Sequence, residues 1–124
     1  ENSNSIGNLI LHLAGNVNQW INSGLGQVED HRHRQAEFDE RQVIGKEKLV
    51  SKLLMTMAMA REVISNLPEK ELLRVRPVQT FEETGLSILI HVTEHFSYHT
   101  GQIAYITKMI GDKQLGFYED IRLE

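Results

Sequence analysis

Three histidines at four-residue steps constrain the fold of this chain more than any other feature. They are His91, His95 and His99, within the stretch from Ile90 to Ile103. A helix turns by about 100° per residue, so residues four apart share one face. Apolar residues accompany them at helical spacing: Ile88, Val92, Phe96, Ile103, Ile106 and Ile110. The spacing predicts an amphipathic helix over residues 84–110 that carries histidines along its apolar stripe.

The three histidines do not occupy equivalent places on this helix. His99 falls near the centre of the apolar stripe, His95 about 50° from it and His91 about 90° from it. We therefore expect His99 and His95 to face inward and His91 to lie at the rim. Buried imidazole nitrogens need partners, and a divalent metal ion chelated by two histidines on adjacent turns is one. The alternative is a core pair bonded to each other or to carbonyl groups, and the helix alone does not decide.

Composition limits the number of domains, the residues that could bind a metal and the partners that the protein could bind. The chain has 124 residues and is predicted to be a single domain, residues 1–124. It contains no cysteine, so any metal must be bound through nitrogen or oxygen, and a reducing cytoplasm is the expected compartment. Thirteen basic and seventeen acidic residues give a net charge of −4 without a basic block, so no nucleic acid is expected as a partner.

No segment of the sequence predicts a membrane span. The longest mostly apolar run, Leu53 to Ala60, is far shorter than the roughly 20 residues that a span needs, so a soluble protein is expected. The sequence begins at Glu1 rather than methionine, so it does not show whether the protein carries a targeting signal.

A second amphipathic helix is predicted near the start of the chain, over residues 5–23. Ser5 is a suitable N-cap, and Gly24 follows the last apolar residue. The apolar positions at spacings of three and four are Ile6, Leu9, Ile10, Leu13, Val17, Trp20 and Ile21. His12 lies about 120° from the centre of this stripe, from where it can reach into a groove between helices. A polar boundary residue is the ordinary interpretation of His12, and a metal ligand is the alternative.

The middle of the chain predicts one further long helix and two connections. The helix spans residues 46–66 and is ended by Pro68. Residues 68–85 then form a long crossover, with a short helix at 69–73 and extended backbone at 75–78. The earlier segment, residues 29–34, is predicted to be a solvated loop that carries His31 and His33, with Asp30 or His31 overhanging the site as the weaker alternative. Together these elements predict an all-α bundle.

Two elements of the sequence resemble the DinB superfamily of bacterial metal-binding four-helix bundles. One is His-Leu-x-x-Asn at residues 12–16, within the stretch 2–16, and the other is His-x-x-x-His-x-Gly-Gln at residues 95–102. The resemblance covers nearly the whole chain and is closest to a subgroup of unknown function. It implies a DinB-like up-down bundle in which His12, His95 and His99 bind a divalent ion, nickel or zinc. The positions of the histidines on the helix independently favour His95 and His99 over His91 as inward-facing residues.

The resemblance also implies a choice between two classes of function. Some relatives are thiol-dependent transferases or isomerases that use glutathione, mycothiol or bacillithiol. A three-histidine ion retains an open position, so we expect a metal- and thiol-dependent transferase or hydrolase with a low-molecular-weight thiol cosubstrate. The alternative is a non-catalytic metal-binding or association protein. No catalytic residue is assigned, but four polar residues lie close to the ligands by spacing: Asn16, Glu94, Tyr98 and Gln102.

One departure from the family pattern predicts the assembly. The bundles of the family usually begin with a further helix ahead of the one that carries the early histidine, and the first family helix has no counterpart in this sequence. Either the sequence is a fragment of a longer chain, or the fourth helix position is filled by a partner copy or left exposed as an apolar groove. We therefore expect a homodimer.

Overall fold

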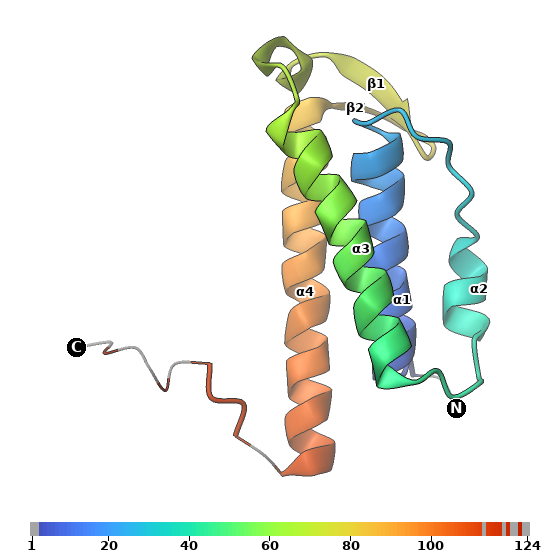
Figure 1. Ribbon diagram of the computed structural model, residues 1–124, viewed down its shortest axis with the longest axis vertical. Helices are drawn as coiled ribbons and strands as arrows, with labels where there is room; N and C mark the ends of the chain where they lie inside the picture. The colour runs from blue at the N-terminus through green and yellow to red at the C-terminus, as the bar shows by residue number, and fades with distance from the viewer. Residues whose placement is uncertain (1–2, 113, 118, 120–121, 123–124) are drawn as a thin grey trace.

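Three long helices lie side by side in the computed structural model, which describes residues 3–112, 114–117, 119 and 122 (Figure 1). They are α1 (Ile6–Val17), α3 (Lys46–Ser65) and α4 (Gly85–Gly111). Helices α1 and α3 run in the same direction, and α4 runs opposite to both. Helix α1 contacts α3, α4 and the short helix α2 (Arg34–Asp39), so it is the element on which the others pack.

Helix α1 begins at its predicted N-cap, Ser5, which forms a capping box with Asn8. The Ser5 hydroxyl accepts from the Asn8 backbone N–H at 3.1 Å, and Asn8 Oδ1 accepts from the Ser5 backbone N–H at 3.0 Å. After Val17 the helix widens into a π-helical segment, η1 (Asn18–Ser23). The helix predicted over residues 5–23 is thus present, with its last part π-helical rather than α-helical.

The hydrophobic core lies where η1 meets α3, α4 and the crossover. Burying each large apolar side chain contributes about 1.5–3 kcal/mol, so this cluster holds one end of the three helices together. Its buried members are Val17, Trp20, Ile21, Leu25, Ala60, Val78 and Ile88.

The crossover contains a β-hairpin that the sequence only half predicts. A 3-10 turn, η2 (Glu69–Leu72), precedes the antiparallel strands β1 (Val75–Val78) and β2 (Phe81–Thr84). The extended backbone at residues 75–78 was predicted, but its pairing with β2 was not. The molecule is therefore mostly helical with a small two-stranded sheet, rather than purely all-α.

Helix α4 begins and ends one residue later than its sequence predicts. The Thr84 hydroxyl accepts from the Ser87 backbone N–H at 3.1 Å, which makes Thr84 the N-cap. Gly111 remains helical, and the left-handed residue that terminates the helix is Asp112, with φ 45°.

Helix α2 lies beside α1 and begins at the end of the segment predicted as a loop, residues 29–34. The Asn8 side chain donates to the carbonyl oxygens of Glu37 at 2.8 Å and Glu40 at 3.0 Å. Helix α2 buries no residue completely, so it lacks the apolar face from which a helix is predicted. Tertiary hydrogen bonds hold it in place instead.

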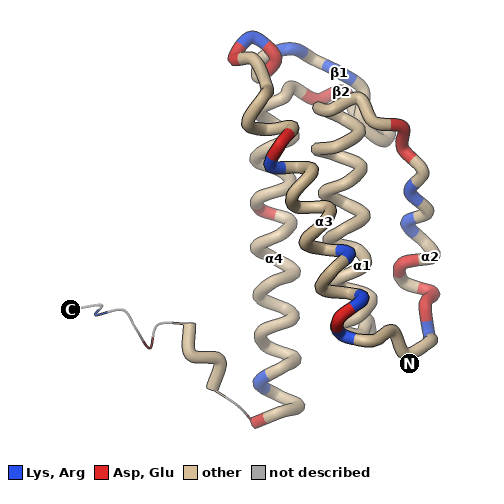
Figure 2. Tube along the Cα trace, in the orientation of Figure 1, with Lys and Arg blue, Asp and Glu red and all other residues tan. Residues whose placement is uncertain are grey.

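Charge is distributed unevenly over the molecule (Figure 2). Charged residues gather along α2 and the segment before it, whereas α1 has none and α4 carries only Glu94 and Lys108. Among the described residues, no helix has both the length and the apolar character that crossing a membrane requires.

Candidate metal centre

His12, His95 and His99 come together where α1 faces α4. Each offers a nitrogen, and these three atoms lie within 4.8 Å of one another. The Nε2 atoms of His12 and His95 are 3.0 Å apart. His12 is buried, and His95 and His99 are half-buried.

The spacing of these nitrogens suits a shared ion. Two nitrogens that each lie 2.0–2.1 Å from one metal are about 2.9–3.4 Å apart at bond angles of 90–109°. The His12–His95 separation of 3.0 Å falls within that range. The third nitrogen, from His99, lies within 4.8 Å of the other two. The residues present therefore fit a divalent ion bound by three imidazoles.

The hydrogen bonds of His12 direct its Nε2 toward the cluster. Nδ1 lies 2.9 Å from Glu37 Oε2 and 3.1 Å from Arg32 Nη2. A carboxylate can only accept, so the short contact with Glu37 requires that Nδ1 carry the proton. The guanidinium also only donates, so its contact with Nδ1 is packing rather than a hydrogen bond. The lone pair of His12 then resides on Nε2, which faces His95.

His99 is oriented in the same way by a residue of its own helix. Its Nδ1 lies 2.7 Å from Gln102 Oε1, and Gln102 Nε2 donates to the Tyr98 hydroxyl at 3.1 Å. The amide oxygen accepts the Nδ1 proton, which leaves the Nε2 lone pair of His99 free. Gln102 and Tyr98, two of the four neighbours expected from spacing, thus form a chain behind His99.

His95 is the histidine whose electrostatic environment is most unusual. Burial, followed by the charges of His99, His12, His91 and Arg32, lowers the pKa of His95 to about 4. Burial is also the main cause of the lowered pKa of His99. Metal ions bind the neutral imidazole, so these shifts keep both rings ready to bind a metal near neutral pH.

Several buried polar atoms have no hydrogen-bond partner among the described residues, and two of them bear on the site. They are Nδ1 of His95 and Oδ1 of Asn16, which is on α1 one turn after His12. An imidazole that binds a metal through Nε2 carries its proton on Nδ1, and that N–H needs a hydrogen-bond acceptor. Asn16 Oδ1 is a side-chain oxygen on α1 that is itself buried without a donor in the described part of the chain.

Glu37 and Arg32 are the site residues that the sequence did not reveal. Arg32 Nε donates to Glu37 Oε1 at 2.8 Å and Arg32 Nη2 donates to Glu37 Oε2 at 2.9 Å, a bidentate pair. Burial alone raises the pKa of the Glu37 carboxyl, but its hydrogen bonds with His12 and Arg32 outweigh burial and lower it. Glu37 therefore stays ionised behind His12. No helical periodicity marked either residue, because both belong to the segment around α2.

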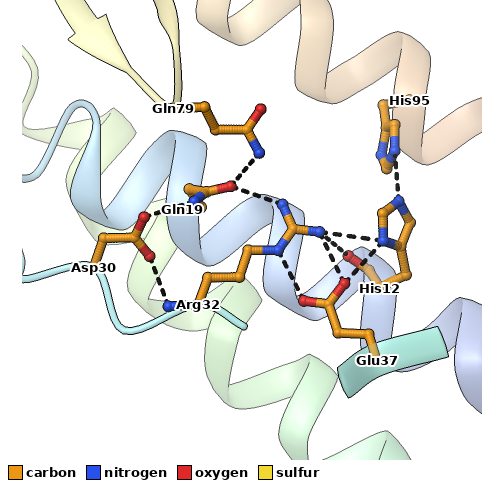
Figure 3. A network of polar contacts seen from close by, with 7 residues as sticks. All are labelled: His12, Gln19, Asp30, Arg32, Glu37, Gln79 and His95. Carbon is orange, nitrogen blue, oxygen red and sulfur yellow. Dashed lines mark hydrogen bonds and ion pairs between the residues drawn. The ribbon is translucent and has the colours of Figure 1, made fainter. Parts of the chain in front are cut away.

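A polar network ties this pair to the rest of the molecule (Figure 3). Arg32 Nη1 donates to Gln19 Oε1 at 2.9 Å, and Gln19 Nε2 donates to Asp30 Oδ2 at 2.6 Å. Gln79, from the hairpin turn, also donates to Gln19. Asp30 therefore reaches the network at a distance from the histidines, rather than overhanging them.

The remaining histidines lie outside the cluster. His91 stacks on Trp20 with ring centroids 3.8 Å apart, which agrees with its expected place at the rim. His31 is exposed beside Glu29, and His33 is exposed as the residue before α2. Glu94, the remaining neighbour expected from spacing, is exposed as well.

The cluster offers three nitrogen donors and no carboxylate. Among the described residues, the group of ligand atoms contains His12, His95 and His99 only. Glu37 contacts the opposite ring nitrogen of His12, so it cannot complete the same coordination sphere. An ion held by these residues would keep an open position.

Comparison with known proteins places the chain in a family without an assigned activity. The model of the family described as Protein of unknown function (DUF1572) matches residues 1–118. Comparisons with curated proteins and with solved structures found no match. Because the family model matches almost the whole length of the sequence, this chain belongs to the DUF1572 family of proteins of unknown function.

Proposed function

We propose that the protein binds one divalent ion, nickel or zinc, through His12, His95 and His99, within a DinB-like bundle. The observation that carries the proposal is the approach of two Nε2 atoms to 3.0 Å while the Nδ1 atoms of His12 and His99 face acceptors. Nitrogen donors of this kind suit zinc and nickel better than magnesium or calcium. The resemblance to the DinB superfamily supports the same ligand set.

The proposed activity is a metal- and thiol-dependent transfer or hydrolysis. A divalent ion with an open position lowers the pKa of a bound water or thiol and so supplies a nucleophile near neutral pH. A pocket of about 350 Å³ is lined in part by Gln102, the residue that accepts from His99, and a small cosubstrate could fill this volume. Its lining includes Leu9, one turn before His12 on α1, together with Gln102 and Tyr105. We further propose a cytoplasmic location, because the chain has no cysteine to oxidise.

A second candidate is a non-catalytic metal site that ties α1 to α4. Its support is the burial of His12, whose side chain is only 5% exposed. Titrating the cobalt-substituted protein with low-molecular-weight thiols separates the two candidates. A sulfur-to-metal charge-transfer band in the near ultraviolet supports the thiol-dependent enzyme. A spectrum that stays unchanged when excess thiol is added supports the structural site.

The proposed assembly is a homodimer formed through the groove between α3 and α4. This groove has a volume of about 340 Å³, and no charged residue lines it. Its floor is Val17 of α1 and Ile21 of η1, and its walls include Met57, Ile64 and Phe96. Two copies of an uncharged face can meet about a two-fold axis without repulsion, and exposed apolar faces of this kind are typical association sites.

A further inference from the structure

The Glu37–Arg32 pair is packed directly onto a glycine of the helix that carries His12. Gly15 lies three residues after His12, on the neighbouring turn of α1. A Cβ atom at this position would lie 2.8 Å from Glu37 Cδ and 2.9 Å from Arg32 Nε. A side chain at this position would therefore push the Glu37 carboxylate away from α1.

Arg32 is itself fixed at several points, so the carboxylate has little freedom. Its guanidinium donates to Gln19 on η1 and to Glu37 in a bidentate manner, and its backbone N–H donates to Asp30 Oδ1 at 3.0 Å. Only 3% of the Arg32 side chain and 12% of the Glu37 side chain is exposed. Arginine with a carboxylate in this geometry makes a strong, directional pair.

We propose that Glu37, held by Arg32 over Gly15, is the positioning residue of the metal centre. It fixes the tautomer and the ring orientation of His12 and strengthens Nε2 as a donor. The physical basis is that a carboxylate bonded to the second nitrogen of a metal-binding imidazole raises the basicity of the first. This inference rests on the proposed function and extends it, because it assigns control of metal affinity to the segment around α2.

A coupling between the metal and α2 follows from this assignment. If Glu37 strengthens the metal site, a bound ion must stabilise the docked position of Glu37 by the same free energy. Zinc should therefore slow amide hydrogen exchange in α2, which contributes no ligand of its own.

The direct test is the zinc affinity of tag-free Glu37→Gln, measured by competition with a chromophoric chelator. Loss of such a partner typically weakens metal binding by about 10–100-fold, and we expect a loss in that range. The matched control is Glu29→Gln, which changes an exposed carboxylate and should leave the affinity within about twofold of the unmodified protein. Because Glu37→Gln leaves buried Arg32 without a counter-charge, Glu37→Gln combined with Arg32→Gln provides a neutral second variant.

A glycine substitution tests the same inference without changing a hydrogen-bonding group. Gly15→Ala should keep α1 helical, since alanine favours helix over glycine, while it displaces Glu37 and weakens zinc binding by at least about tenfold. Gly7→Ala, on the same helix, adds a Cβ at an ordinary 3.5 Å from Ser5 Oγ and should bind zinc normally. The ligand-field spectrum of bound cobalt should change in Gly15→Ala and not in Gly7→Ala.

The outcomes separate this inference from the proposed function. Folded Glu37→Gln and Gly15→Ala proteins that bind zinc within about twofold of the unmodified protein, with an unchanged cobalt spectrum, would overturn the role of Glu37. An unmodified protein that binds no zinc or nickel would instead remove the proposed function itself.

Discussion

At the scale of single residues, each imidazole of the cluster has a distinct environment. His12 donates to a carboxylate and His99 donates to an amide oxygen, whereas His95 Nδ1 has no partner among the residues described. Alanine at any of the three positions removes a donor that no neighbouring carboxylate can replace. The three imidazoles are chemically similar, but the partners of their Nδ1 atoms differ.

His12→Ala, His95→Ala and His99→Ala should each lose most of the bound metal, because two imidazoles hold a divalent ion poorly. His31→Ala and His33→Ala serve as controls, since both histidines are exposed and outside the cluster. Metal content after gel filtration is the measurement. Full retention of metal in His99→Ala would remove that residue from the site.

The lowered pKa values predict a shallow pH dependence of metal affinity. Protons compete with a metal only where they titrate its ligands, and the pKa of His95 is about 4 while that of His99 is also lowered. Three imidazoles with ordinary pKa values would lose about 30-fold in affinity between pH 7 and 6, and we expect less than about 10-fold here. Zinc competition titrations at both pH values provide the measurement, and a loss of 30-fold or more would contradict the low pKa values.

At the scale of elements, the long helices were predictable from sequence and the short ones were not. The long helical segments follow from apolar periodicity and their caps to within a residue or two: α1 continued by η1, α3 and α4. Helix α2 and the strand β2 have no such pattern, because tertiary hydrogen bonds and strand pairing hold them. The same reasoning explains why Glu37 escaped prediction while Gln102, three residues after His99 on one helix, did not.

Asn8 joins α1 to α2, in addition to the contact between His12 and Glu37, and its loss should affect both helices. Asn8→Ala removes half of the capping box and both bonds to α2, so the free energy of unfolding should fall by about 1–2 kcal/mol. Asn66→Ala is the control, because Asn66 also donates to a carbonyl oxygen but is exposed. Denaturant unfolding of both proteins is the measurement. Equal stabilities would show that Asn8 does not anchor α2.

At the scale of the whole molecule, the ligands come from the two ends of the chain. His12 is separated from His95 by 83 positions, yet their Nε2 atoms lie 3.0 Å apart. The angular positions of the histidines on one helix were enough to predict that His95 and His99 face inward. That His12 lies beside them follows only from the tertiary structure or from the family resemblance. The side of α4 next to the α3–α4 groove remains apolar, which is the basis of the proposed dimer.

Light scattering tests that assembly. The unmodified protein should have the mass of a dimer at micromolar concentration, and Met57→Glu should be monomeric because it places charge in the groove. Met55→Glu is the matched control, since Met55 is exposed on the same helix but does not line the groove. A monomeric unmodified protein, or a dimeric Met57→Glu protein, would argue against this interface.

The central claim is that one ion binds between the three Nε2 atoms. The most direct measurement is an anomalous-difference map from crystals of the zinc-loaded protein, collected at the zinc absorption edge. One strong peak per chain is expected, about 2.0–2.1 Å from Nε2 of His12, His95 and His99. A map without a peak between these histidines, or with the peak at His31, His33 or His91 instead, would contradict it.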